Sequence, residues 1–364
     1  MAQYALYRLP HQDSYTYLAQ TQGTPLIIPS VEALDGREGF VFAPFSPSEE
    51  CPILLMQPDV VKVMRLPAAA DSSCHHAETA VCRTADSTMP SWDAWDSDAE
   101  WEDYAKDFAC FHHELTEGHF DKIVLARKSK VVGEHADAEQ MFMEACHRYP
   151  HLFVALVSME QSGTWLMATP EILLEGGKQE WKTMALAGTM AAQSMSQSKE
   201  AADDTPIDYW SAKNIEEQQI VTSYIEHILR PCSDDFQMKG PYTVHANNLV
   251  HLRTDFHFHL SPNHSFGSVL SQLFPTPAVC GMPKEKAQQF ILAHEHTPRK
   301  YYSGFVGPLH PEGHTHLYVT LRCMQISDGA CELYAGGGLL KESSDMKEFE
   351  ETKQKMQTMF ALLR

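Results

Sequence analysis

Apolar residues alternate with polar ones in short runs near the start of the chain and recur at helical spacing further on. The runs Thr24–Ile28 and Gly39–Ala43, punctuated by proline and glycine, predict strands and turns over residues 1–66. Residues 67–97 are small, polar and acidic, which predicts an exposed loop. A helical period then covers residues 98–115.

The segment DKIVLARKSKVV follows this helix and predicts a strand. Its alternation places Lys122 on the same face as Val124 and Ala126. A lysine on a buried face, desolvated enough to lose its proton near neutral pH, can act as a general base. A lysine at the solvated end of a strand would give the same pattern, so the spacing leaves both interpretations open.

A carboxylate occurs in an apolar setting in the segment GTWLMATPEILLEG, which we interpret as one strand. Glu171 follows a proline there and has Met167 and Ile172 as neighbours. Such surroundings raise the pKa of a carboxyl group, as a general acid requires. A strand carboxylate turned towards solvent is the alternative.

The segment NIEEQQIVTSYIEHIL predicts an amphipathic helix with two candidate acids. Glu217 shares a face with Val221 and Tyr224 and is expected to point inward. Glu216 fits Ile220 and Tyr224 equally well, so periodicity alone does not choose between the two carboxylates.

A glycine run and a charged helix come together in the stretch YAGGGLLKESSDMKEFEETKQK. Gly336–Gly338 are expected to form a loop after a strand, where backbone N–H groups can approach an anion. Ser344 is the expected N-cap of the helix. Glu348, Glu351 and Lys355 share one helix face, where carboxylates could hold a hard divalent cation. A turn followed by a solvated helix is the alternative.

Residues 302–309, 317–326 and 330–334 predict an antiparallel meander that leads into the glycine run. Histidines gather at three places in the chain, and we interpret all of them as surface residues rather than metal ligands. The groups are His75 and His76 beside Cys74 and Cys82, His257 and His259 in a strand, and His310, His314 and His316 in a turn.

The charge balance limits the possible partners. With 48 acidic and 28 basic residues among 364, the formal net charge is −20, which disfavours nucleic acid or an anionic membrane and requires a local positive site for an anionic substrate. No apolar run could span a bilayer, and MAQYALYRLP lacks a signal-peptide pattern, so a cytoplasmic protein is expected. Nine cysteines without a C-x-x-C pair indicate reduced thiols.

Eight segments together resemble the chorismate-utilising enzymes in order and rough spacing. They are KIVLAR, ATPEILLE, ALAGT, EEQQIV, PTPAVCGMP, YYSGFVG, TLRC, and YAGGG followed by EFEET. The resemblance covers residues of about 100–364. It implies an α/β fold of two layered antiparallel sheets with helices outside. Residues 1–97 would be a variable N-terminal part of that fold, and residues 98–364 the chorismate-binding catalytic region.

The resemblance also implies roles for individual residues. Glu217 and Glu351 would hold Mg²⁺, with Glu348 nearby, and the ion would bind the ring carboxylate of chorismate. Lys122 would be the general base and Glu171 the general acid. The residues implied to bind substrate or line its pocket are Gly188, Thr189, Tyr302, Arg322, Gly336, Gly338 and Lys355.

Two positions indicate which nucleophile is used. Lys122 resembles the water-activating lysine of isochorismate and salicylate synthases, which anthranilate synthases replace by a non-basic residue. Ala187 stands where aminodeoxychorismate synthases resemble one another in carrying a nucleophilic lysine. The resemblance therefore implies an isochorismate synthase, an isomerase that adds water at C2 and removes the C4 hydroxyl. Phe274 departs from the usual polar residue before PTPA, which puts the polarity of the pocket in question.

Three alternatives remain open at this point. A salicylate synthase would carry isochorismate on to salicylate and pyruvate. An anthranilate or aminodeoxychorismate synthase component would need ammonia and a glutaminase partner. A non-catalytic protein would bind chorismate or Mg²⁺ without turnover. We expect a monomer without a glutaminase, and the lack of a siderophore-associated domain favours menaquinone over siderophore biosynthesis.

Overall fold

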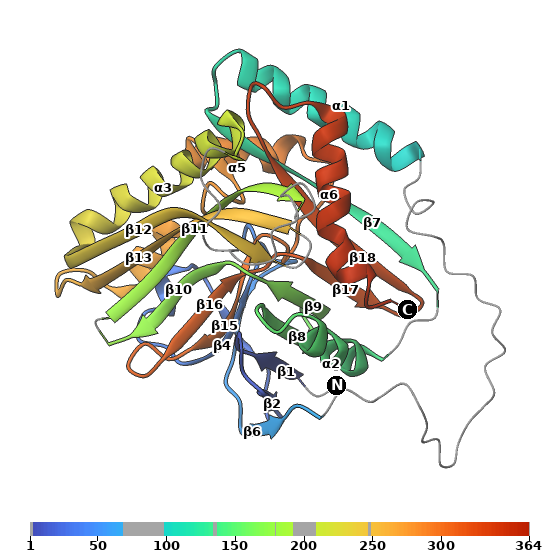
Figure 1. Ribbon diagram of the computed structural model, residues 1–364. Helices are drawn as coiled ribbons and strands as arrows, with labels where there is room; N and C mark the ends of the chain where they lie inside the picture. Colours follow the sequence, from blue (N-terminus) through green and yellow to red (C-terminus); the bar gives the residue numbers. More distant parts are fainter. Residues whose placement is uncertain are drawn as a thin grey trace.

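The computed structural model describes residues 3–67, 98–133, 137–178, 180–191, 209–246 and 249–363. Within them the chain forms two antiparallel sheets with helices on their outer faces, which confirms the predicted fold class (Figure 1). The loop expected over 67–97, beyond its first residue, and the cysteine–histidine group inside it lie outside the described residues. No helix in the described part has the length and apolar character needed to cross a bilayer.

The first sheet begins at the edge formed by β14 and takes strands from both ends of the chain. In spatial order its strands are β14 (Gly281–Met282), β7 (Lys122–Val132), β18 (Ala330–Leu339), β17 (Cys323–Ser327), β9 (Gly163–Thr169), β8 (Phe153–Met159), β1 (Gln3–Arg8), β2 (Ser14–Gln20) and β6 (Val60–Arg65).

The second sheet is also completed by strands from the N-terminal part. In spatial order its strands are β12 (Ser233–Ala246), β13 (Leu249–Leu260), β11 (Glu180–Ala191), β10 (Ile172–Gly177), β16 (Thr315–Val319), β15 (Phe305–Leu309), β4 (Gly39–Ala43), β5 (Ile53–Met56) and β3 (Leu26–Ile28).

Helices cover the apolar outer faces of both sheets. α2 and α6 pack on the first sheet, α3 and α4 pack on the second, and α1 and α5 pack beside β7 and β14 (Figure 1). Aromatic side chains fill the space between the sheets. The helices are α1 (Asp98–Thr116), α2 (Ala138–Arg148), α3 (Ala212–Cys232), α4 (Phe266–Leu273), α5 (Lys284–His294) and α6 (Asp345–Phe360), with a 3₁₀ turn η1 (Glu32–Leu34).

Two predicted strands are in fact pairs of strands that belong to different sheets. GTWLMATPEILLEG forms β9 in the first sheet and β10 in the second, and residues 317–326 contain parts of β16 and β17, so the predicted meander is wrong. The breaks fall at Pro170, which cannot donate to a strand ladder, and at Arg322, whose φ is 45°. A continuous apolar pattern does not reveal such a crossing, because both strands are buried.

The predicted glycine loop is also wrong. β18 continues through Gly336–Gly338, which pair with Ala126, Leu125 and Val124 of β7. The backbone N–H groups of this run therefore belong to a sheet rather than to an open anion cradle. Ser344 occupies the N-cap position of α6, but its side chain makes no capping hydrogen bond.

Candidate active site

The two crossings between the sheets lie side by side. The backbone N–H of Val319 donates to the carbonyl of Glu171 at 3.0 Å, and the N–H of Ala168 donates to the carbonyl of Arg322 at 3.1 Å. Both crossing residues are buried, with 2% of Glu171 and 6% of Arg322 exposed. The chain thus brings a carboxyl group and a guanidinium cation to one place between the sheets.

A cavity lined from both sheets holds most of the residues singled out in the sequence. Glu171 and Glu217 line it, and so does His251. It is also lined by all seven residues predicted to contact substrate: Gly188, Thr189, Tyr302, Arg322, Gly336, Gly338 and Lys355. Gly188 forms a bulge in β11 at φ 68°, so the short apolar segment predicted around it is one long strand.

Lys122 and Glu217 form a buried ion pair at the edge of this cavity. Lys122 is fully buried on the inner face of β7, as its alternation with Val124 and Ala126 allowed, and its Nζ lies 2.9 Å from Glu217 Oε1. Glu217 projects inward from α3, whereas Glu216 is exposed. Burial acts to raise the pKa of Glu217, but the ammonium groups of Lys122 and Lys213 outweigh it and hold that pKa below its ordinary value.

The glycines of β18 provide space for this pair and for a second carboxylate. A Cβ atom on Gly338 would lie 2.1 Å from Glu217 Oε1 and 2.7 Å from Lys122 Cε. One residue earlier, where the strand faces the other way, a Cβ on Gly337 would lie 3.1 Å from Glu348 Oε2. The glycine run therefore lets acidic groups approach the strand from both of its faces.

Glu171 is in a suitable electrostatic state to donate a proton. Burial raises its pKa to about 8, while the cationic groups of Lys122 and Lys355 partly oppose that rise. The carboxyl group is therefore largely protonated at pH 7, as a general acid must be.

Two cationic side chains in the cavity wall supply positive charge. Arg322 and Lys355 both line it, and burial lowers the pKa of Arg322 only to about 10, so the guanidinium group stays charged at neutral pH. Lys355 Nζ donates to the carbonyl of Gly336 at 2.9 Å and pairs with Glu351 at 2.7 Å. This is the local positive site that the acidic composition required.

His251 is a site residue that the sequence did not reveal. Its Nε2 lies 2.6 Å from Arg322 Nη2 and its Nδ1 lies 3.1 Å from the carbonyl of Gly188. A guanidinium can only donate, so Nε2 accepts and the ring proton sits on Nδ1. Burial and the charges of Arg322 and Lys355 hold the pKa of His251 well below its ordinary value, which keeps this neutral tautomer.

Alternation alone could not find His251. It has the same parity in β13 as His257 and His259, which are more exposed, as predicted. The group that covers His251 is Arg322, 71 residues further along the chain. No local pattern encodes that contact.

Glu348 and Glu351 lie behind the glycine strand, on α6, and Lys213 reaches them from α3. Lys213 Nζ forms an ion pair with the buried carboxylate of Glu348. Burial and the neighbouring Glu351 raise the pKa of Glu348, against the opposing charge of Lys213. Within the described part of the chain, the carboxylate oxygens of Glu217, Glu348 and Glu351 are not gathered within 4.8 Å of one another.

A family model described as chorismate binding enzyme matches residues 63–364, which is most of the chain. The chain belongs to the chorismate-binding enzyme family. Two relatives are the vibriobactin-specific isochorismate synthase of Vibrio cholerae, 30% identical over 69% of this chain and 63% of its own length, and isochorismate synthase EntC of Escherichia coli, 28% identical over 66% and 61%. The chain thus spans about three fifths of the length of these relatives.

Two solved structures share the fold of this chain. The menaquinone-specific isochorismate synthase MenF of Escherichia coli aligns with a TM-score of 0.77 at 20% identity, covering 100% of this chain and 89% of that one. Anthranilate synthase component I of Streptococcus pneumoniae aligns with a TM-score of 0.60 at 18% identity, covering 71% of this chain and 57% of that one.

Ala187 and Phe274, two positions that the sequence singled out, differ in their location. Ala187 lines the cavity and places a methyl group on its wall. Phe274 is buried against Phe305 in the core beneath α4 and does not line the cavity. The departure at Phe274 therefore leaves the polarity of the cavity unchanged.

Proposed function

We propose that the protein is an isochorismate synthase that adds water to C2 of chorismate and removes the C4 hydroxyl. The observation that carries this proposal is the placement of a fully buried amine, Lys122, beside a cavity whose wall holds a carboxyl group, Glu171, with a pKa of about 8. Water addition with loss of a hydroxyl needs one group to accept a proton and another to donate one. The isochorismate synthase relatives support the same reaction.

In this mechanism Lys122 first gives up its ammonium proton to solvent, and the neutral amine then takes a proton from water as the oxygen of that water bonds to C2. The ring double bond shifts, the bond from C4 to its hydroxyl breaks, and Glu171 protonates the departing oxygen, so that one water is consumed and one released. After this step Lys122 holds the proton from the attacking water and Glu171 is ionised, and proton exchange with solvent restores both groups. The net reaction is an isomerisation with no change of oxidation state.

The remaining cavity residues orient the substrate. Arg322 can donate two parallel hydrogen bonds to a carboxylate, and Lys355 supplies a second positive charge. The neutral His251 fixes the guanidinium through its Nε2.

Thr189 and the backbone of Gly336 complete the polar wall of the cavity, while Leu186 and Val279 exclude water from the substrate ring. Ala187 offers no amine, so water is the nucleophile.

Magnesium is the cofactor that we propose for Glu217, Glu348 and Glu351. Carboxylate oxygens are the ligands that Mg²⁺ prefers, and Gly337 and Gly338 leave room for two of these side chains against β18. When bound, the ion would hold the ring carboxylate of chorismate and balance its charge. Lys213 now neutralises Glu348, and Lys122 pairs with Glu217, so both carboxylates must exchange an ammonium partner for the metal.

Replacing Lys213 by methionine is therefore expected to tighten Mg²⁺ binding about tenfold. A charge-assisted hydrogen bond contributes about 1.5–3 kcal/mol, and ~1.4 kcal/mol corresponds to a factor of ten. Isothermal titration of Mg²⁺ into both proteins measures the change. Lys239→Met is the control, since Lys239 is exposed on β12. Equal affinity in the Lys213 variant and the parent protein would show that this ammonium does not compete with the ion.

The rate of isomerisation is expected to fall at alkaline pH. Glu171 donates only when protonated, so with a pKa of about 8 its active form is present below pH 8 and declines about tenfold per pH unit above it. Measuring kcat separately from KM between pH 6 and 10 tests this. A value of kcat that stays constant from pH 6 to pH 10 would contradict the proposed protonation of Glu171.

The activity itself is tested by incubating the protein with chorismate and Mg²⁺ in the absence of ammonia. We expect isochorismate, identified by chromatography with mass detection, and its loss on addition of EDTA. Salicylate with pyruvate would indicate a salicylate synthase. Turnover only with ammonia would contradict the role of Lys122, and binding without turnover would indicate a non-catalytic chorismate-binding protein.

We propose that the product is used in menaquinone biosynthesis. Restored menaquinone content in a bacterium that lacks its own isochorismate synthases would support this use.

A further inference from the structure

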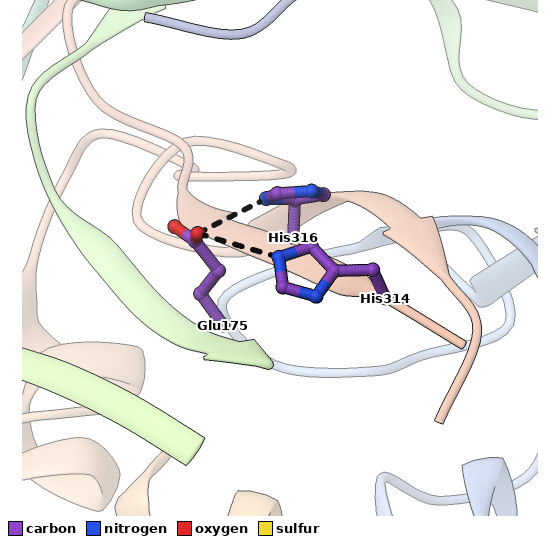
Figure 2. A group of neighbouring side chains, drawn as sticks. All are labelled: Glu175, His314 and His316. Carbon is purple, nitrogen blue, oxygen red and sulfur yellow. Dashed lines mark ion pairs between the residues drawn. The ribbon is translucent and has the colours of Figure 1, made fainter. Parts of the chain in front are cut away.

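A compact group of metal-binding side chains lies outside the cavity, at the outer ends of β10 and β16. It consists of Glu175, His314 and His316, whose ligand atoms all lie within 4.8 Å of one another (Figure 2). Glu175 Oε1 is 3.4 Å from His316 Nδ1 and 3.7 Å from His314 Nε2. In the described part of the chain this is the group whose spacing suits a single ion.

The sheet register brings these residues together. Glu175 and His316 are direct cross-strand partners in β10 and β16. His314 precedes His316 by two residues and points to the same side, while Thr315 between them is fully buried (Figure 2). The sequence predicted surface histidines here because Glu175 is far away along the chain.

The distances match those between ligands of a tetrahedral ion. Two ligands that are each about 2.1 Å from zinc lie about 3.4 Å apart. By contrast, 3.4 Å is long for a hydrogen bond between an imidazole and a carboxylate, and His316 Nδ1 is buried without one. A ring nitrogen that faces a carboxylate at this distance leaves room for an ion that both atoms could bind.

One cation competes with a metal for the carboxylate of this group. Lys182 Nζ lies 2.8 Å from Glu175 Oε1 and is the competing cation.

We propose that Glu175, His314 and His316 form a zinc-class metal site that ties the β10–β11 hairpin to the β15–β16 hairpin. Two imidazoles and one carboxylate suit a borderline ion such as Zn²⁺, whereas the carboxylates near β18 suit a hard ion. His314 is exposed, so water can take the fourth position. None of the three residues lines the cavity, so the site is structural and independent of the proposed isomerase activity.

The test is a titration of Zn²⁺ into the metal-free full-length chain, produced without a histidine tag. We expect one equivalent to bind, with affinity at least about tenfold weaker in His314→Ala and in His316→Ala. His310→Ala is the matched control, because His310 lies in the same turn but pairs with Glu38. Zn²⁺ should also raise the melting temperature of the parent protein and not that of the His314→Ala, His316→Ala double variant.

A second variant keeps the proposal testable if the histidine variants fold poorly. Lys182→Met removes the ammonium that competes for Glu175 and is expected to tighten Zn²⁺ binding several-fold. Glu217→Gln weakens the carboxylate site and should leave this Zn²⁺ equivalent unchanged. Parent-like affinity in the double variant, no effect of Lys182→Met, or no zinc bound to the parent protein would overturn the assignment.

Discussion

Replacing Lys122 by methionine is expected to lower kcat about 10²–10⁴-fold while leaving chorismate affinity nearly unchanged, because the substitution removes the proton acceptor but no carboxylate contact. Methionine has a similar volume and is uncharged. The substitution leaves the buried carboxylate of Glu217 without its Lys122 partner, which is expected to lower the free energy of unfolding by up to about 3–5 kcal/mol, so the unfolding measurement must show that the variant is folded under the assay conditions. Steady-state kinetics, calorimetric titration of chorismate and urea unfolding measure the three quantities.

Lys128→Met is the matched control for this prediction. Lys128 lies on the same strand, β7, but is partly exposed and pairs with Glu332 at 2.6 Å, away from the cavity. Its replacement should leave kcat within about twofold of the parent value. Near-normal turnover in Lys122→Met would remove Lys122 from the role of base and with it the reason for proposing water as the nucleophile.

Replacing Glu217 by alanine is expected to impair both turnover and stability. The change leaves Lys122 buried without its carboxylate partner, and breaking a buried pair in this way costs about 3–5 kcal/mol of unfolding free energy. Mg²⁺ binding should weaken at the same time, because one of three proposed ligands is lost. Urea unfolding and calorimetric titration of Mg²⁺ measure the two effects.

Glu216→Ala provides the control for this second substitution. Glu216 is the next residue along α3 but is exposed, so its truncation should change stability by no more than about 0.5 kcal/mol. If Mg²⁺ binds Glu217→Ala as tightly as it binds the parent protein, Glu217 does not belong to the metal site. The loss of stability would then reflect the ion pair with Lys122 alone.

Local periodicity was sufficient where a residue's surroundings lie on its own element. The alternation in β7 correctly placed Lys122 on the same face as Val124 and Ala126. The helical period of α3 narrowed the inward-facing carboxylate to Glu216 or Glu217. In that case the structure decides for Glu217, since packing against the second sheet fixes which side of the helix faces inward.

Periodicity failed where a role depends on what approaches from elsewhere. The glycine run resembled a loop because its actual function, space for Glu217 and Glu348, depends on two helices that the pattern does not connect to it. The pairing of Lys213 was not predicted for the same reason, because its partner Glu348 lies 135 residues further along the chain. The changes of sheet at Pro170 and Arg322 were not predicted, because two consecutive buried strands have the apolar pattern of a single strand.

The N-terminal strands are as firmly tied into this architecture as the strands that the family model covers. That model begins at residue 63, yet β1 lies between β8 and β2, and β4 lies between β15 and β5. In β4, Phe40 and Phe42 pack between the sheets, whereas Val41 packs in the core cluster of the second sheet and its helices. Inserting or deleting one residue within β4 would therefore exchange the side chains of these two cores, and the mismatch in volume would affect both at once.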